Sequence, residues 1–160
     1  GAEKNRLTWK DALDQQKQQL GYTEQAYALI IGGGQNGIVL GARLRMLGVP
    51  CIIIEKNNKP GDNWRKRYKS LCLHDPVWYD HLPYIPFPGF WPVFTPKDKM
   101  GDWLKIYSKV MELNYWSNSS CKKASYNEKL VLGPWPLIWM ENNLYCSQHN
   151  LFWLPADPAR

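Results

Sequence analysis

Residues 26–55 read AYALIIGGGQNGIVLGARLRMLGVPCIIIE, and this stretch decides the fold. It opens on a short apolar run, which predicts a buried strand over 26–31. An amphipathic pattern over about 36–47 predicts a helix, and Gly48 is a suitable residue to end it. The run 51–54 is rich in β-branched isoleucine and predicts a second buried strand. The order strand, glycine-rich turn, helix and strand predicts a βαβ unit of an α/β fold.

The glycines of the turn follow the spacing of a dinucleotide-binding site, with Gly32, Gly34 and Gly37 in a G-x-G-x-x-G pattern. Gly32 permits the tight turn from strand to helix, and the missing side chain of Gly34 lets a pyrophosphate approach the backbone. Gly37 and Gly41 allow the helix to pack closely on the sheet. Because a predicted strand precedes the pattern and a predicted helix follows it, we expect a Rossmann-type site rather than a glycine-rich turn without a ligand.

Polar residues beside the turn are the candidate ligands of the nucleotide. Gln35 and Asn36 lie at the helix N terminus, where unpaired N–H groups and the positive end of the helix dipole bind a pyrophosphate. Glu55 ends the second strand, where its carboxylate can accept hydrogen bonds from ribose hydroxyls, and Lys56 lies next to it. An acidic residue at that place disfavours a 2′-phosphate. These residues alone do not separate FAD from NAD.

Length and composition exclude several classes of protein. The chain of 160 residues forms at most one domain, and its net charge of +6 comes from scattered Lys and Arg, so we expect no nucleic-acid partner. No apolar run approaches about 18 residues, so we expect no membrane span. The cysteines have neither CxxC nor zinc-ligand spacing, so we expect no metal site. Cys51 and Cys72 lie in apolar runs and are predicted to be buried free thiols, as suits a reducing, cytoplasmic compartment.

Two further helices are predicted outside the βαβ unit. The first is a polar helix over 8–20, with Thr8 as N-cap and Asp11 at its third position. The second begins near Pro96, with Thr95 as N-cap and the proline at the first helical position. Its apolar residues recur at helical spacing and are predicted to face the core, namely Met100, Trp103, Leu104, Tyr107, Val110 and Met111.

The chain between the second strand and the second helix is predicted to consist mainly of loops. Residues 57–66 form a polar loop, and 67–73 form a short extended piece. The many prolines of 75–96 exclude regular helix, so we expect an ordered loop there.

These loops resemble a known family. The motifs are Gly-Asp-Asn-Trp at 61–64, Leu-Cys-Leu-His-Asp-Pro at 71–76, Asp-Pro-Val-Trp-Tyr-Asp-His-Leu-Pro at 75–83 and Pro-Phe-Pro at 86–88. In order and spacing they resemble the class B flavin-dependent monooxygenases, which include the flavin-containing monooxygenases and the plant YUCCA branch. The resemblance covers about residues 25–127. It implies FAD as cofactor, NADPH as reductant, and insertion of one oxygen atom of O2 into a small organic substrate.

The resemblance also implies roles for individual residues. In the family a G-G-x-W segment lies against the flavin side of the cofactor, so Trp64 is expected there, although Asp62 replaces the second glycine. His74 lies two residues before Pro76 and is the candidate catalytic residue beside the flavin ring. The alternative for His74 is a loop histidine bonded to the backbone.

Parts of the family pattern are missing from the sequence. It has no second glycine-rich turn for NADPH and no Ala-Thr-Gly segment. We therefore expect a polar lead-in at 1–25, a partial FAD-binding domain at 26–127 and an off-family tail at 128–160. A one-base frameshift near Lys129 would explain the tail, because residues 138–160 can be back-read to a hairpin turn, a strand and Ala-Thr-Gly. A stop codon in that frame of the coding DNA would refute this hypothesis, which also implies an open sheet edge prone to aggregation.

The sequence thus predicts an incomplete Rossmann-like FAD-binding unit, a fragment of an FAD-dependent, NADPH-using monooxygenase. Without an NADPH site, the 160 residues are expected to show no substrate-dependent NADPH oxidation. One alternative is another two-dinucleotide flavoprotein, such as a disulfide reductase, which the lack of a CxxC pair disfavours. The other is a non-catalytic remnant or nucleotide-binding module. The expected partner of the parent enzyme is a small-molecule substrate, and the sequence sets no oligomeric state.

Overall fold

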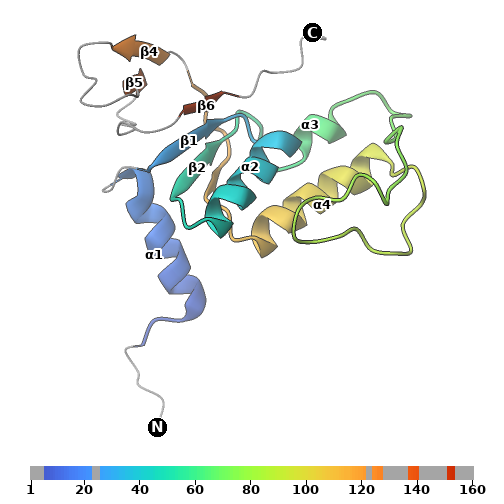
Figure 1. Cartoon of the computed structure of the whole chain (residues 1–160), viewed down its shortest axis with the longest axis horizontal. Coiled ribbons are helices and arrows are strands. Elements are labelled where there is room, and N and C mark those ends of the chain that lie inside the picture. Colours follow the sequence, from blue (N-terminus) through green and yellow to red (C-terminus); the bar gives the residue numbers. More distant parts are fainter. Residues whose placement is uncertain (1–5, 23–25, 122–123, 128–136, 141–150, 154–160) are drawn as a thin grey trace.

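The computed structural model describes residues 6–22, 26–121, 124–127, 137–140 and 151–153. These residues form a parallel sheet with helices packed on it and a separate antiparallel strand pair (Figure 1). None of the helices among them has the length and apolar character needed to cross a lipid bilayer. The Ala-Thr-Gly back-reading of the tail lies outside the described residues. In chain order, the elements are α1 (Trp9–Tyr22), β1 (Ala28–Ile31), α2 (Gln35–Met46), β2 (Cys51–Ile54), α3 (Asp62–Arg65), α4 (Lys97–Val110), β3 (Tyr115–Trp116), β4 (Ala124–Asn127), β5 (Leu137–Met140) and β6 (Leu151–Trp153).

The main sheet has the strand order β3-β2-β1-β6, and its neighbouring strands are all parallel. β1 and β2 pair along their whole length, with Ala28 opposite Cys51. A helix-containing crossover joins them, as parallel neighbours require. Both strands expected from the sequence are confirmed, and β1 begins two residues later than the predicted 26–31.

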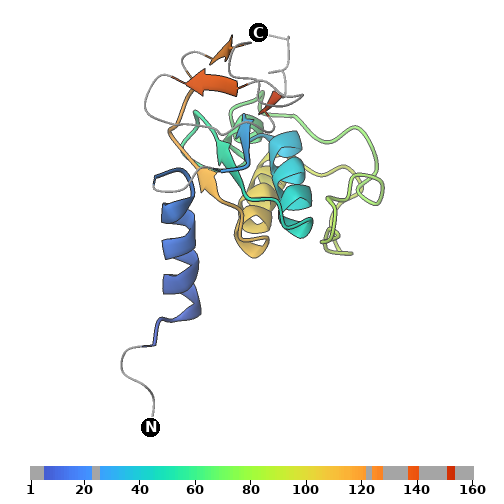
Figure 2. The same cartoon turned by 60° about the vertical axis from the view of Figure 1, so that its left-hand side comes forward.

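The strands of this sheet bury side chains on both faces. Ile30 and Ile53 belong to the larger core cluster, on the face covered by α2 and α4. Leu29 and Ile52 belong to a smaller cluster on the other face, against which Trp116 packs. Figures 1 and 2 show α2 and α4 on one side of the sheet and α1 projecting away from it. Burial on both faces explains why the two strands are continuous apolar runs rather than alternating patterns.

α2 lies close to the sheet because Gly41 has no side chain. A Cβ atom at Gly41 would lie 2.5 Å from Cδ1 of Ile53. The helix ends at Met46, and Gly48 follows in the left-handed conformation with φ of 71°. The Gly48 N–H donates to the Arg45 carbonyl oxygen (2.9 Å), which satisfies one of the free carbonyls of the last turn. The expected helix and its glycine stop are therefore confirmed.

The start of α4 differs from the prediction. The helix begins at Lys97 with Pro96 as N-cap, so the expectation of Thr95 as N-cap and proline inside the helix was wrong. The Thr95 carbonyl oxygen accepts a hydrogen bond from Leu73 N–H (2.8 Å), and Lys97 N–H donates to the Leu71 carbonyl oxygen (3.0 Å). These hydrogen bonds to residues 71–73 hold Thr95 and Pro96 in an extended conformation. The helix therefore starts one residue later than predicted, and Thr95 lies one position before the N-cap. The Thr95 hydroxyl is buried, with no hydrogen-bond partner among the described residues.

The predicted apolar face of α4 is confirmed except at its last turn, where the Val110 residue is 61% exposed. Lys109, the residue before it, is also exposed, so this end of the helix lies at the surface. The other members of the face are buried against the core, namely Met100, Trp103, Leu104, Tyr107 and Met111.

Two smaller expectations had opposite outcomes. The cap of α1 is confirmed, because the Thr8 hydroxyl donates to the Asp11 carboxylate (2.5 Å) and Asp11 N–H donates to the Thr8 hydroxyl (3.2 Å).

Cys72 is exposed, so the prediction of a buried thiol there was wrong. Successive residues of an extended segment point to opposite sides, and here Leu73 takes the buried side. Cys51 is half-buried, and burial raises the pKa of its thiol to about 11.

The segment predicted as a polar loop at 57–66 contains the short helix α3, which the sequence did not indicate. Gly61 precedes it in the left-handed conformation with φ of 86°. A Cβ atom at Gly61 would overlap the carbonyl oxygen of Gly101 in α4, so the two backbones touch at a pair of glycines. By contrast, the loop expected at 75–96 is confirmed, since the interior of that segment has no helix or strand.

The edge of β1 is not open, which corrects the expectation drawn from the missing family strand. β6 pairs with β1 in parallel, with Leu29 opposite Leu151 and Ile31 opposite Trp153. Residues 151–153 belong to the predicted off-family tail, so part of that tail completes the sheet. Pairing satisfies the backbone groups of β1 that would otherwise form a template for aggregation.

Candidate functional site

The glycine-rich turn lies at the carboxyl end of β1, where the direction of strand order reverses. From β1 the chain moves outward through β2 to β3, and β6 then lies on the other side of β1. In open parallel sheets, ligands bind in the crevice beyond the carboxyl ends of the strands at such a reversal. The fold therefore places residues 32–37 at the preferred ligand position of this architecture.

The turn is fixed by the backbone of its first glycine. Gly32 has φ of 103°, a left-handed conformation that side chains disfavour, and its N–H donates to the Ile54 carbonyl oxygen at the end of β2 (2.9 Å). A Cβ atom at Gly37 would overlap the Gly32 carbonyl oxygen. Gly32 thus allows the tight turn that the sequence predicted, and Gly37 allows the helix to start directly against it.

Gly34, the second glycine of the G-x-G-x-x-G pattern, faces a single side chain in the described part of the chain. A Cβ atom at Gly34 would lie 3.2 Å from Nδ2 of Asn63, and no other described residue would lie within 4 Å of it. Gly34 is the N-cap of α2, and no side chain caps the helix. The first N–H groups of an α-helix have no intrahelical partner, so this N terminus presents unpaired donors. Gln35 is half-buried and Asn36 is exposed at the same helix end.

Glu55 is held at the turn by internal hydrogen bonds. Its Oε2 accepts from Gly33 N–H (2.7 Å), and its Oε1 accepts from the N–H and Nδ2 of Asn57 (3.0 and 2.6 Å). A carboxylate has about four acceptor positions. One position on Oε2 is therefore left for a ribose hydroxyl, although the residue is only 7% exposed. Lys56 is exposed beside it.

Asn63 is a residue of the site that the sequence reasoning missed. Its Oδ1 is buried, with no hydrogen-bond partner among the described residues, and its Nδ2 faces Gly34. An unpaired buried amide oxygen requires a partner, because its burial alone costs free energy. The missing side chain of Gly34, the uncapped helix and this unpaired amide fit a phosphate-containing ligand with hydroxyl groups, such as FAD. The only sequence signal was the position of Asn63 inside the Gly-Asp-Asn-Trp motif.

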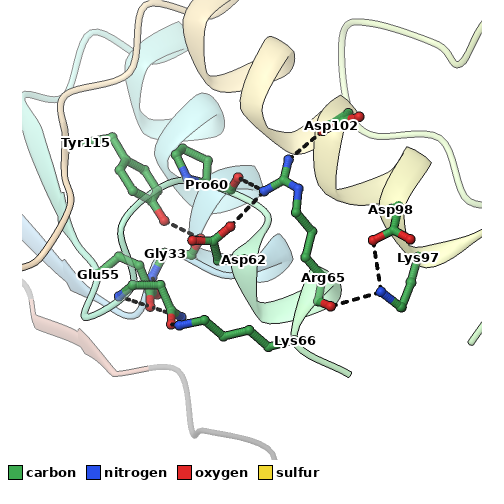
Figure 3. A network of polar contacts seen from close by, with 11 residues as sticks. Gly33, Glu55, Pro60, Asp62, Arg65, Lys66, Lys97, Asp98, Asp102 and Tyr115 are labelled. Atoms are coloured by element: carbon green, nitrogen blue, oxygen red, sulfur yellow. Dashed lines mark hydrogen bonds and ion pairs between the residues drawn. The ribbon is translucent and has the colours of Figure 1, made fainter. Parts of the chain in front are cut away.

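The aspartate that replaces the second glycine of the family motif has a structural partner. Asp62 is buried, and its Oδ1 accepts a hydrogen bond from Arg65 Nη1 (2.9 Å). The same guanidinium donates to the Pro60 carbonyl oxygen and to Asp102 in α4 (3.0 and 2.8 Å; Figure 3). Arg65 thereby connects α3 to α4, and Asp62 is the buried half of that ion pair.

The two residues expected on the flavin side, Trp64 and His74, differ in how far they are buried. Trp64 is half-buried and packs on the larger core cluster. The His74 side chain is 93% exposed, and its Nε2 lies 3.4 Å from the Asp75 carboxylate. His74 is thus exposed to solvent. The other predicted site residues at the turn lie together at one edge of the sheet, namely Gly32, Gly34, Gln35, Asn36, Gly37 and Glu55.

The fold and the turn define the class of the protein: an incomplete Rossmann-type dinucleotide-binding unit. No protein-family model matches the chain. Indole-3-pyruvate monooxygenase YUCCA6 of Arabidopsis thaliana is 31% identical over 108 residues, which are 67% of this chain and 25% of that protein. The flavin-containing monooxygenase from Stenotrophomonas maltophilia has a TM-score of 0.62 at 21% identity, covering 79% of this chain and 36% of that one.

A second solved structure agrees with the first. OTEMO in complex with FAD and NADP has a TM-score of 0.64 at 21% identity, covering 80% of this chain and 25% of that one. The chain is thus similar in sequence to indole-3-pyruvate monooxygenases, and it shares the fold of the matching part of these two monooxygenase structures. It spans about a quarter of the length of the curated relatives.

Proposed function

We propose that this chain binds FAD as part of a flavin-dependent monooxygenase that uses NADPH and O2 to oxygenate a small organic substrate. The observation that carries the proposal is the N terminus of α2, which starts at the N-cap Gly34 without a side-chain cap and lies at the reversal of strand order. The N–H groups and dipole at such a helix end bind phosphate. The sequence likeness to YUCCA6 and the fold likeness to flavoproteins support FAD as the dinucleotide.

In this proposal the residues divide by the part of FAD that they contact. The backbone of Gly32, Gly34, Gln35, Asn36 and Gly37 holds the pyrophosphate. Glu55 accepts from the adenosine ribose through its remaining lone pair, and Lys56 adds a positive charge at the rim.

The flavin end of the site is proposed to involve Trp64 and His74. Trp64 is half-buried, packs on the larger core cluster and follows Asn63 in the chain. His74 is exposed in these 160 residues, so a role beside the flavin ring requires that further parts of the enzyme cover it. FAD supplies the redox chemistry when bound, and the chain supplies binding and orientation.

Replacing Gly34 by alanine is expected to raise the dissociation constant of FAD tenfold or more, which corresponds to about 1.4 kcal/mol. The added methyl group would occupy the face that the pyrophosphate approaches, while its nearest protein atom would be the Asn63 amide at 3.2 Å. Flavin fluorescence titration of the purified chain measures the change. Thermal unfolding of the FAD-free chain should move little, because φ of Gly34 is −72°, an ordinary value for alanine.

The matched control is Gly89→Ala, in an exposed loop where a Cβ atom would meet nothing within 4 Å. It should bind FAD as the original chain does. A colourless original chain that shows no flavin binding at saturating FAD would contradict the proposal and favour the non-catalytic remnant. Equal affinities of all three proteins would show that FAD binds elsewhere.

We also propose the division of the chain into a lead-in at 1–25, a partial FAD-binding domain at 26–127 and a tail at 128–160 produced by a one-base frameshift. The coding DNA tests the frameshift directly. Among the described residues Cys51, Cys72 and Cys121 are free thiols, which supports a reducing compartment such as the cytoplasm.

A further inference from the structure

The backbone of Gly33 is held on both sides by side chains from neighbouring strands. Its N–H donates to Glu55 Oε2 at the end of β2 (2.7 Å). Its carbonyl oxygen accepts a hydrogen bond from the Tyr115 hydroxyl, which comes from β3 (2.8 Å). Figure 3 shows the Tyr115 hydroxyl and the Glu55 carboxylate converging on Gly33. Side chains at the end of β2 and in β3 thus hold the two successive peptide units that meet at Gly33, in the turn that follows β1.

Gly33 and Tyr115 fit each other closely. A Cβ atom at Gly33 would overlap both the hydroxyl and the ring of Tyr115. The glycines with positive φ in the described residues are Gly21, Gly32, Gly48 and Gly61, so backbone conformation does not require glycine at 33. The close approach of Tyr115 explains the glycine at this position.

The Tyr115 hydroxyl also lies in an environment that keeps it protonated. Burial, with the nearby carboxylates of Glu55 and Asp62, raises the pKa of Tyr115 far above its ordinary value. The hydroxyl therefore remains a hydrogen-bond donor to the Gly33 carbonyl oxygen over the whole physiological pH range.

We propose that Tyr115 is a cofactor-positioning residue, whose hydroxyl orients the peptide unit that joins Gly33 to Gly34 and so presents the N–H groups at the start of α2 to the pyrophosphate. The inference rests on the proposed FAD binding. Fixing donors before the ligand arrives removes an ordering cost that would otherwise reduce affinity. Tyr115 acts through Gly33 and needs no contact with FAD itself.

The test compares the variants Tyr115→Phe and Tyr107→Phe. Tyr107 is a second buried tyrosine, and its hydroxyl donates to the Pro83 carbonyl oxygen (2.7 Å), on α4 and away from the turn. Both substitutions remove one tyrosine-to-carbonyl hydrogen bond and keep the ring. Tyr115→Phe is expected to raise the FAD dissociation constant about tenfold, whereas Tyr107→Phe should leave it within about twofold.

Equal loss of affinity in the two variants would mean that Tyr115 acts only through general stability, and unchanged affinity in Tyr115→Phe would equally overturn the inference. Amide hydrogen exchange of the FAD-free chain gives a readout independent of binding. Tyr115→Phe should speed exchange of the Gly33 amide by about tenfold or more relative to the same amide in Tyr107→Phe.

Failure of the proposed function looks different from failure of this inference. If the original chain does not bind FAD, the proposed function is wrong, and hydrogen exchange alone then tests whether Tyr115 holds Gly33. Unchanged exchange of the Gly33 amide in Tyr115→Phe would refute that role of Tyr115 whether or not FAD binds. Faster exchange together with weaker FAD binding supports both.

Discussion

Replacing Gly61 by alanine is expected to destabilise the chain by about 3 kcal/mol, a large part of the stability of a small domain. Its left-handed backbone, with φ of 86°, costs an alanine roughly 1–2 kcal/mol. The new Cβ atom would also overlap the Gly101 carbonyl oxygen, and overpacking typically costs about 1–3 kcal/mol. Backbone atoms cannot rotate away as side chains do, so α3 must move off α4. Urea unfolding followed by tryptophan fluorescence measures the loss.

Other glycines of the chain separate the causes of this effect. Gly48 also has positive φ, but a Cβ atom there would meet nothing within 4 Å, so Gly48→Ala should cost only the backbone strain of roughly 1–2 kcal/mol. Gly89 has neither constraint, and Gly89→Ala should stay within about 0.5 kcal/mol. If Gly61→Ala were no worse than Gly48→Ala, the close approach of α3 and α4 would be wrong.

Ending the chain after residue 127 is expected to make it aggregate. This deletion removes β6 and leaves the edge of β1 unpaired, opposite the places of Leu151, Phe152 and Trp153. Lost backbone hydrogen bonds at about 1 kcal/mol each give a destabilisation of roughly 2–3 kcal/mol. The exposed edge of an apolar parallel strand is also a template for association between copies. Light scattering and size-exclusion chromatography at increasing concentration measure the effect.

The control for the deletion is a chain that ends after residue 153. It keeps β6 while removing the residues beyond it, and it should behave like the 160-residue chain in both measurements. A monomeric, equally stable chain 1–127 would show that β6 contributes nothing to the sheet, and that the tail is dispensable for the fold.

The βαβ unit was predictable because its signals are local. Two apolar runs, a glycine spacing and the glycine stop at Gly48 each act through the conformation of a few neighbouring residues. The capping pair Thr8 and Asp11 was predictable for the same reason, since both partners lie within one helical turn. The N-cap of α4 was not, because a pairing with residues 71–73, far away in the chain, shifts the helix start by one residue.

The site shows the same division. The positions of Gly32, Gly34 and Glu55 at one sheet edge follow from the sequence pattern alone. The unpaired amide of Asn63 and the hydroxyl of Tyr115 do not, because each meets the turn only after α3 and β3 are folded against it. The exposure of the His74 side chain could not be predicted either, because a sequence motif gives the order of residues and not the residues that pack around them.

The sequence by itself determined the opening strand, turn, helix and strand, and with them the kind of ligand edge that the chain presents. These features depend on backbone freedom at glycine and on burial periodicity, which are properties of adjacent residues. Only the tertiary structure decided that β6 closes the edge of β1, that Gly61 and Gly101 bring α3 against α4, and that Tyr115 holds Gly33. Contacts between distant segments depend on how whole elements pack, and local residue order carries no direct record of that packing.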